Sequence, residues 1–228
     1  MRSVLLVVPL LLAACLPWAP RSAAAPQCPA GGAPPPPDAA ERQVADLDGD
    51  GSPDTLWIGR VQQAGAVTRV VGVSTASGTN SDVQVATASP IPLSALAIDA
   101  QENGRHQVIV SDGRGARLYE YTDCRLQTVV DNHYGKPFLF DLQNLRGSGT
   151  GVGCSDLGDG RRLVGLQALD DSGQWTVRRT EIDLAGLQAS TGRSDTLTAT
   201  SAADPVVTSA QTISCGDLTI TQDGVQER

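Results

Sequence analysis

Nine residues near the start of the chain have the residue types and spacing of a calcium-binding loop. Residues 46–54 read DLDGDGSPD, with carboxylates at positions one, three, five and nine. Calcium prefers six to eight hard oxygen ligands, and a glycine at position six allows the sharp turn that brings alternate side chains together. The expected ligands are the four carboxylates and one backbone carbonyl: Asp46, Asp48, Asp50, Asp54 and the carbonyl of Ser52.

The residues that follow this loop argue against an EF-hand. An EF-hand carries an acidic residue at position twelve, where this chain has Trp57, and the following residues have strand character rather than helical character. The alternative is a solvated acidic turn held by side-chain to backbone hydrogen bonds. Four aspartates within nine residues repel one another when no cation is present, which favours a structural calcium ion.

The loop pattern recurs along the chain. The stretch 99–107 matches it position by position but has amides in place of the later carboxylates, and the stretch 156–163 keeps the frame with one residue fewer. A fainter fourth copy follows Cys215. Internal repetition of this kind is typical of folds built from similar units. Because the later copies have lost carboxylates, we expect one good calcium site, in the first loop.

Short apolar and β-branched runs separated by Gly, Asp, Asn and Ser fill the chain from residue 43 onward. Several of these runs alternate with a period of two, and none of about twelve residues holds a helical period. The sequence therefore predicts an all-β repeat domain over residues 43–228.

The stretch VADLDGDGSPDTLWIG, residues 44–59, resembles the FG-GAP or VCBS-type repeats of integrin-α-like β-propellers. The resemblance implies a propeller-like stack of short antiparallel sheets, with about four blades or an incomplete propeller, and one calcium loop of the DxDxDGxxD type. A β-sandwich is the alternative architecture.

The first residues indicate export from the cytoplasm. A positive Met1-Arg2 start and a short apolar run end in Leu-Ala-Ala-Cys15, which resembles the lipobox of bacterial lipoproteins. Residues 1–15 are then a signal peptide with a lipidated Cys15, and the Pro/Ala-rich residues 16–42 form a tether. The alternative is secretion after cleavage at Ala25, which ends a small-residue run. No later apolar run is long enough to span a bilayer as a helix.

Four further cysteines indicate two disulfides, because an even number in an exported chain is typical of a disulfide framework. Four cysteines allow three pairings. We expect Cys28–Cys215, which would join the first and last elements, and Cys124–Cys154, which would join neighbouring sheets. The competing pairing, Cys154–Cys215, rests on the matched positions of these two residues in the repeats.

Composition narrows the function. The formal charge is −8 and Lys and Arg form no cluster, so the chain lacks the basic surface of a nucleic-acid binder. It also lacks a nucleophile elbow or phosphate-binding motif. We expect a non-enzymatic protein outside the cytoplasm that presents loops to an envelope protein or glycan and contacts membranes only through its lipid. The alternative is a secreted hydrolase or lectin-like sugar binder that uses acidic pairs such as Asp170 and Asp171.

Overall fold

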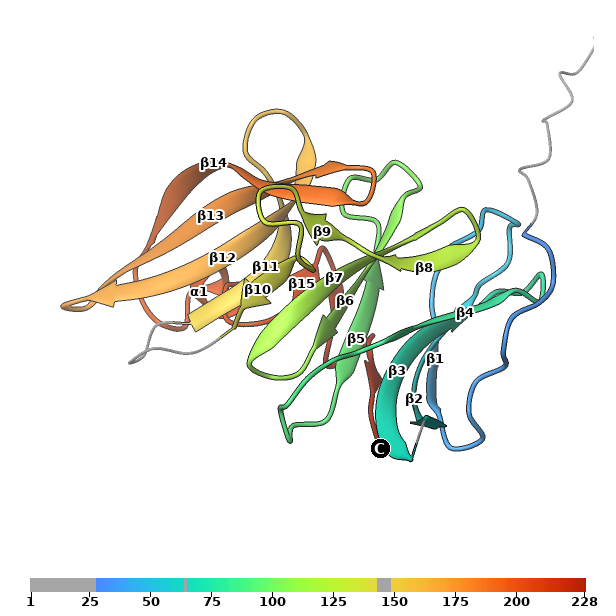
Figure 1. The fold of residues 1–228 in the computed structure, drawn as a ribbon. Coiled ribbons are helices and arrows are strands. Elements are labelled where there is room, and N and C mark those ends of the chain that lie inside the picture. The colour runs from blue at the N-terminus through green and yellow to red at the C-terminus, as the bar shows by residue number, and fades with distance from the viewer. Residues whose placement is uncertain (1–27, 64, 143–148) are drawn as a thin grey trace, which may run out of the picture.

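A computed structural model describes residues 28–63, 65–142 and 149–228 (Figure 1). The proposed signal peptide, Cys15 and Ala25 lie outside the described residues. The regular structure of the described chain is almost entirely β, as the sequence predicts, and every pair of named strands is antiparallel except the short parallel pair of β14 with β9. The single helix among the described residues is the short α1, Pro205–Ser209. It cannot cross a membrane, and no other described segment forms a long apolar helix.

The first sheet is an antiparallel meander of four consecutive strands, in the order β1-β2-β3-β4. Short connections between consecutive strands explain this order, because antiparallel neighbours need only a tight turn. The bounds of the strands are β1 Ala40–Gln43, β2 Thr55–Gln63, β3 Ala66–Ser74 and β4 Asn80–Gln84.

The second sheet follows along the chain and takes up the C-terminal strand. Its order is β10-β7-β6-β5-β17, and β8 also pairs with β7. The strands are β5 Ser94–Ile98, β6 His106–Ser111, β7 Gly115–Thr122, β8 Arg125–Thr128, β10 Leu139–Asp141 and β17 Val225–Gln226.

The third sheet contains the longest strands, in the order β11-β12-β13-β14-β9. Its bounds are β9 Val130–Asp131, β11 Gly149–Asp156, β12 Arg161–Asp171, β13 Gln174–Ala185 and β14 Gln188–Ala199. A two-stranded hairpin follows, with β15 Ser214–Cys215 and β16 Leu218–Thr219. The faint fourth repeat therefore forms only this hairpin, and the described structure has three large sheets rather than four.

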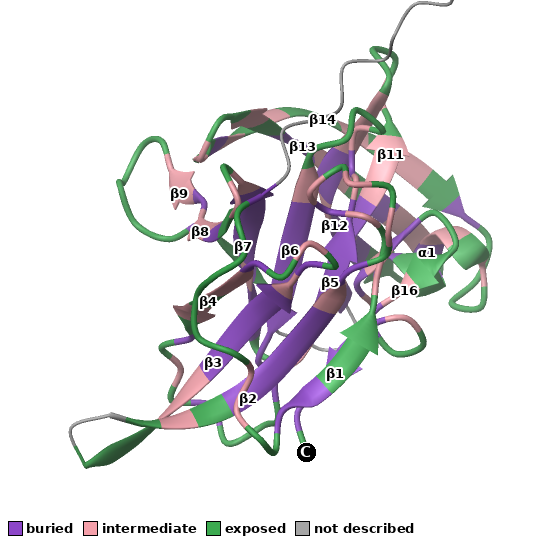
Figure 2. Cartoon of the chain, turned by 90° about the vertical axis from the view of Figure 1, so that its right-hand side faces the viewer, coloured by how far each residue is buried: buried purple, intermediate pink, exposed green. Residues whose placement is uncertain are grey.

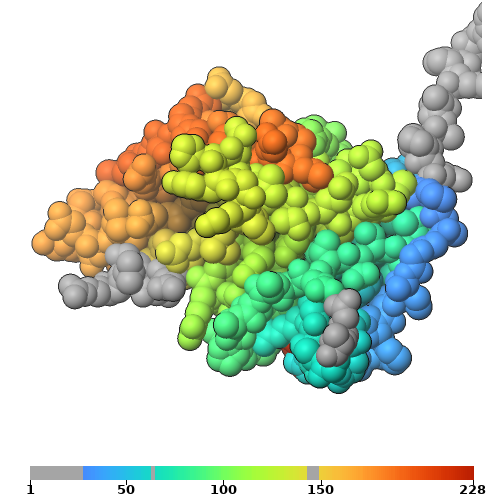
Figure 3. All heavy atoms as spheres, viewed as in Figure 1, coloured from blue at the N-terminus to red at the C-terminus, as the bar shows by residue number. Residues whose placement is uncertain are grey.

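The second sheet is buried on both faces and joins the other two sheets. Along β5, Ala95 and Ala97 pack against the first sheet, while Leu96 and Ile98 pack toward the third sheet. This alternation is the period-two geometry of a strand with two apolar faces. Figures 2 and 3 show the result: the central strands are buried, and the blue-green, green and orange parts of the chain follow one another across the molecule.

The folded domain begins earlier than residue 43. Cys28 is bonded to Cys124, the Gly31 carbonyl accepts from the Asn80 N–H at 2.6 Å, and β1 starts at Ala40. Residues 28–42 were expected to belong to a free tether because of their prolines. They instead run along the first sheet, where backbone hydrogen bonds to the β3–β4 turn and the disulfide to Cys124 hold the segment.

The expected disulfide pairing is wrong. The bonds are Cys28–Cys124 and Cys154–Cys215, with Cα–Cα distances of 5.4 and 4.9 Å. The expectation placed Cys215 in a separate blade, too far from Cys154. The β15 segment instead runs alongside β11, where the Val152 N–H donates to the Thr212 carbonyl at 3.0 Å. The competing pairing of Cys154 with Cys215 is therefore confirmed.

The C-terminal strand is held in the domain by backbone pairing rather than by a disulfide. Strand β17 adds to β5 in the second sheet. The buried carboxylate of Glu227 accepts from the guanidinium of Arg60 at 2.8 Å and from the Leu93 N–H at 2.7 Å. These contacts cover the edge of β5, which would otherwise be open.

Candidate metal site

The three loops of the repeated pattern occupy equivalent places in the fold. The first loop (residues 46–54) connects β1 to β2, the second (99–107) connects β5 to β6, and the third (156–163) connects β11 to β12. Each connects two hydrogen-bonded neighbours of one sheet, one loop in each of the three large sheets. The internal repetition seen in the sequence thus corresponds to a structural repetition.

Three of the expected ligands converge in the first loop. One carboxylate oxygen from each of Asp46, Asp48 and Asp50 lies within 4.8 Å of the others. Burial opposes ionisation of Asp46, but backbone N–H groups of Gly51, Gly49 and Asp50 donate to its carboxylate, and the net effect is a lowered pKa. Asp46 is therefore ionised at neutral pH, as a cation ligand must be.

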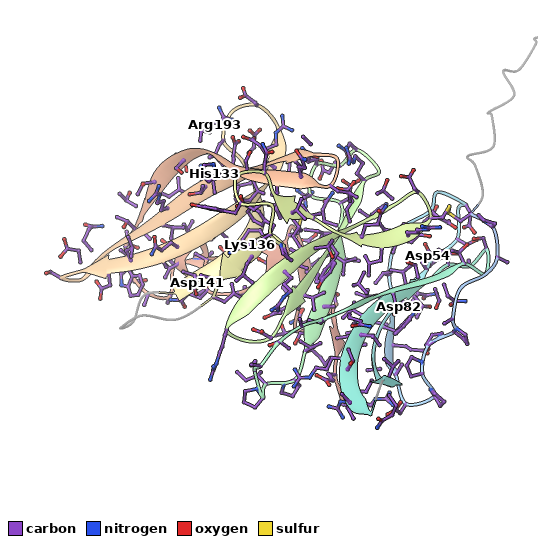
Figure 4. All side chains as sticks on the ribbon, viewed as in Figure 1. Asp54, Asp82, His133, Lys136, Asp141 and Arg193 are labelled. Carbon is purple, nitrogen blue, oxygen red and sulfur yellow. A yellow bond between two sulfur atoms is a disulfide. The ribbon has the colours of Figure 1, made fainter. Side chains whose placement is uncertain are left out.

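Asp54 has a different position from the other three. Its side chain is almost fully buried at the base of the loop, where one oxygen accepts from the Leu47 N–H at 2.7 Å and the other from the Ala76 N–H at 2.9 Å. Burial raises the pKa of Asp54, and the charges of Asp48 and Asp46 add to this. Asp54, labelled in Figure 4, anchors the loop to the turn between β3 and β4 and does not belong to the cluster of three.

The Ser52 N–H donates to the carboxylate of Asp50 at 2.7 Å. Two residues that sequence reasoning missed also contact or face the loop. The Ser77 hydroxyl donates to Asp48 at 2.8 Å from the β3–β4 turn. Burial, together with the charges of Asp48 and Asp54, raises the pKa of Tyr121 to about 12. Neither residue lies near the loop in sequence, so no local pattern could identify them.

The second loop forms two of the same hydrogen bonds as the first loop, although it lacks carboxylates at the third and fifth positions. Asp99 accepts from the N–H groups of Asn103 and Gly104 at 3.1 and 2.7 Å. Asp46 accepts from the corresponding groups of the first loop at the same two distances.

The base of the second loop is matched as well. Gln107 is fully buried, and its side-chain oxygen accepts from the Ala100 N–H at 3.1 Å. Asp54 accepts from Leu47 in the same way. The turn therefore needs one aspartate and an oxygen at its base, and it does not need further carboxylates.

An arginine follows the glycine in the second and third loops, where the first loop has Ser52. Arg105 pairs with the buried carboxylate of Glu120, and its Nε lies 2.9 Å from Oε1. Arg161 pairs with Glu102 of the second loop, and its Nη2 lies 2.8 Å from the Cys215 sulfur. The two later loops thus place a fixed positive side chain next to the turn.

The acidic pairs considered for catalysis serve as turn caps. Asp170 accepts from the Gly173 N–H at 2.8 Å in the β12–β13 turn, and Asp156 accepts from the N–H groups of Gly158 and Gly160.

A cavity of about 650 Å³ near the loops has acidic residues in its lining but no Phe, Tyr or Trp. A second cavity, of about 490 Å³, is lined by Phe138 and Phe140, both of which are buried.

No known protein family, no curated protein and no solved structure matches this chain.

Proposed function

We propose that this protein is a non-enzymatic, extracytoplasmic β-repeat protein of the FG-GAP/VCBS type with one structural calcium ion in the first loop. It is anchored to the cell envelope through a lipid on Cys15, or secreted after cleavage at Ala25, and it presents loops to a protein or glycan partner. Two disulfides support a location outside the cytoplasm, because such bonds persist in oxidising compartments.

The observation that carries the calcium proposal is the comparison of the first two loops. Both form the same turn, but only the first places three carboxylates within 4.8 Å of one another. The turn is complete with Gln101 and Asn103 at the two later positions, so Asp48 and Asp50 add mutual repulsion that the turn does not require. A bound cation offsets this repulsion.

The donor set fits calcium in its chemistry. The converging groups are hard carboxylate oxygens from Asp46, Asp48 and Asp50, and calcium sites are completed by backbone carbonyls and water. The carbonyl of Ser52 is a further proposed ligand, and Asp54 holds the base of the loop. Calcium supplies positive charge that neutralises the carboxylates and fixes the loop on the first sheet.

Calcium should stabilise the folded protein. Extracellular modules bind calcium with dissociation constants of about 10⁻⁴–10⁻³ M, and at a hundred times that constant the native state gains about 2.7 kcal/mol. We expect urea unfolding of the wild type to shift by about this amount between saturating calcium and chelator. Titration calorimetry should give one binding event per chain.

Asp48→Asn is the informative variant, because it removes one charge while the remaining side-chain oxygen can still accept from Ser77; only the longer bond from the Asp50 N–H, at 3.2 Å, is given up. It should lose most of the calcium effect and be at least as stable as the wild type in chelator. Gln101→Ala, at the matching position of the second loop, should keep the full calcium effect. Equal wild-type stability in calcium and chelator would refute the proposal.

Cys15 should carry the lipid in the mature protein. The motivation is the lipobox-like Leu-Ala-Ala-Cys15 and the proline-rich stretch that follows it. Cys15→Ser should move the protein from the membrane fraction to the soluble fraction or leave the precursor unprocessed. Mass spectrometry that finds an unmodified N-terminus at Pro26 would show instead that cleavage follows Ala25.

A further inference from the structure

The outer edge of β14 is open over most of its length. Strand β14 pairs with β13 on one side, and on the other side β9 reaches only Gln188 and Ala189. No described strand pairs with the residues that follow, up to Thr198. In Figure 1 this strand lies at the upper margin of the third sheet, and in Figure 2 it is mostly exposed or half-buried.

The register shows which backbone groups point outward. The β12–β13 hairpin has a two-residue turn that closes on the pair Asp171 and Gln174, and the closing pair of such a hairpin exchanges its hydrogen bonds. Because bonding sides alternate along a strand, Gln174, Thr176 and Arg178 bond toward β12. Trp175 and Val177 therefore bond toward β14.

It follows that alternate residues of β14 direct their N–H and C=O groups away from the sheet: Ser194, Thr196 and Thr198. Their register with β13 is unbroken from Ser194 to Ala199. Natural proteins usually protect such an edge with Lys, Pro or a covering segment. This stretch has neither Lys nor Pro, and no described segment pairs with it.

The charges near this edge differ between the two faces of the sheet. On one face, Arg179 pairs with Asp195, and Arg193 pairs with Glu181. On the other face, Arg178 is exposed and forms no ion pair with any described residue. Arg178 is opposite Thr196, so only a short side chain separates its guanidinium from the open edge.

We propose that an extended segment of a partner protein adds as a strand beside residues 194–198 of β14, with an acidic side chain directed to Arg178. Main-chain hydrogen bonds supply the affinity in this mode of recognition, and side chains on one face supply specificity. A carboxylate accepts a charge-assisted bond from the guanidinium. The inference deepens the proposed binding role by naming a protein partner, and it does not depend on calcium.

A second copy of the chain fits the same edge less well. On the face that carries Arg178, the β14 side chains are Ser194, Thr196 and Thr198, so a second β14 strand would offer Arg178 no carboxylate on that face. The absence of an exposed aromatic ring from the neighbouring cavity, where the two Phe rings are buried, favours a peptide over a sugar.

The test is selection of a phage-displayed library of random twelve-residue peptides on the full chain, in parallel on three variants. Thr196→Pro removes one outward N–H, Arg178→Gln removes the charge, and Arg125→Gln on β8 is a control far from this edge. The wild type and the control should enrich the same acidic peptides with alternating β-branched residues. Thr196→Pro should lose the enrichment, and Arg178→Gln should lose the preference for acidic residues.

Hydrogen exchange on the wild type tests the same edge without a variant. The most enriched peptide should slow exchange of the amides of Ser194, Thr196 and Thr198 by about tenfold, because exchange then requires loss of the added strand. Protection elsewhere only, or equal enrichment on Thr196→Pro, would overturn the proposal. So would a dimer in sedimentation that Thr196→Pro abolishes. The peptide selection and the hydrogen exchange are each run in calcium and in chelator, so that a failure of strand addition can be distinguished from a failure of the calcium proposal.

Discussion

Replacing Cys28 and Cys124 by serine is expected to lower the free energy of unfolding by about 4 to 5 kcal/mol in the chain-entropy model. The bond joins residues 96 positions apart and holds the N-terminal segment against the β7–β8 turn. Loss of the bond raises the conformational entropy of the unfolded chain. It also releases the N-terminal segment from its only covalent anchor in the described domain. Urea unfolding of the oxidised protein and the double variant measures the difference.

The Cys154–Cys215 bond provides the matched comparison. It joins residues 61 positions apart, so the same model gives a loss of about 4 kcal/mol. Its variant should keep the N-terminal segment protected from proteases, whereas the Cys28/Cys124 variant should not. Peptide mapping without reduction should yield the 28–124 and 154–215 linked peptides. A 28–215 peptide would contradict the pairing and the packing of β15 beside β11.

Arg105→Ala is expected to destabilise the protein by about 3 kcal/mol, because it leaves a buried carboxylate without its cation. The side chain of Glu120 is 1% exposed, and the side chain of Arg105 is 43% exposed. The second carboxylate oxygen of Glu120 has no hydrogen-bond partner among the described residues, so Arg105 is the group that compensates the charge. Because Arg105 is partly exposed, the expected loss of stability lies at the lower end of the range for breaking a buried ion pair.

A double variant separates the cost of the unpaired charge from a general effect on the loop. Arg105→Ala combined with Glu120→Leu removes the buried carboxylate, so it should be more stable than Arg105→Ala alone. Arg125→Ala, on the neighbouring strand β8 and without an ion pair among the described residues, should change stability little. Urea unfolding checks all of these. A double variant no more stable than the single variant would show that Glu120 does not require its partner.

The sequence by itself determined the local features of this protein. A period-two run such as that of β13 predicts a strand because the backbone alternates its side chains between two faces. Asp46, Asp48 and Asp50 converge because one short turn contains all three, so no distant contact is needed to bring them together. The equivalence of the first two loops was visible for the same reason: the turn is formed by residues within nine positions.

Only the tertiary structure decided which distant residues meet. Cys154 pairs with Cys215 because β15 runs beside β11, and no local pattern encodes that contact. Asp54 anchors the loop through Ala76, Ser77 reaches Asp48 from another turn, and Glu227 ties the C-terminal strand to Arg60 of the first sheet. Residues 28–42 likewise belong to the domain through contacts with the first sheet and through the disulfide to the β7–β8 turn. Each of these depends on how sheets pack, and packing energy arises from many weak contacts that are distributed along the chain.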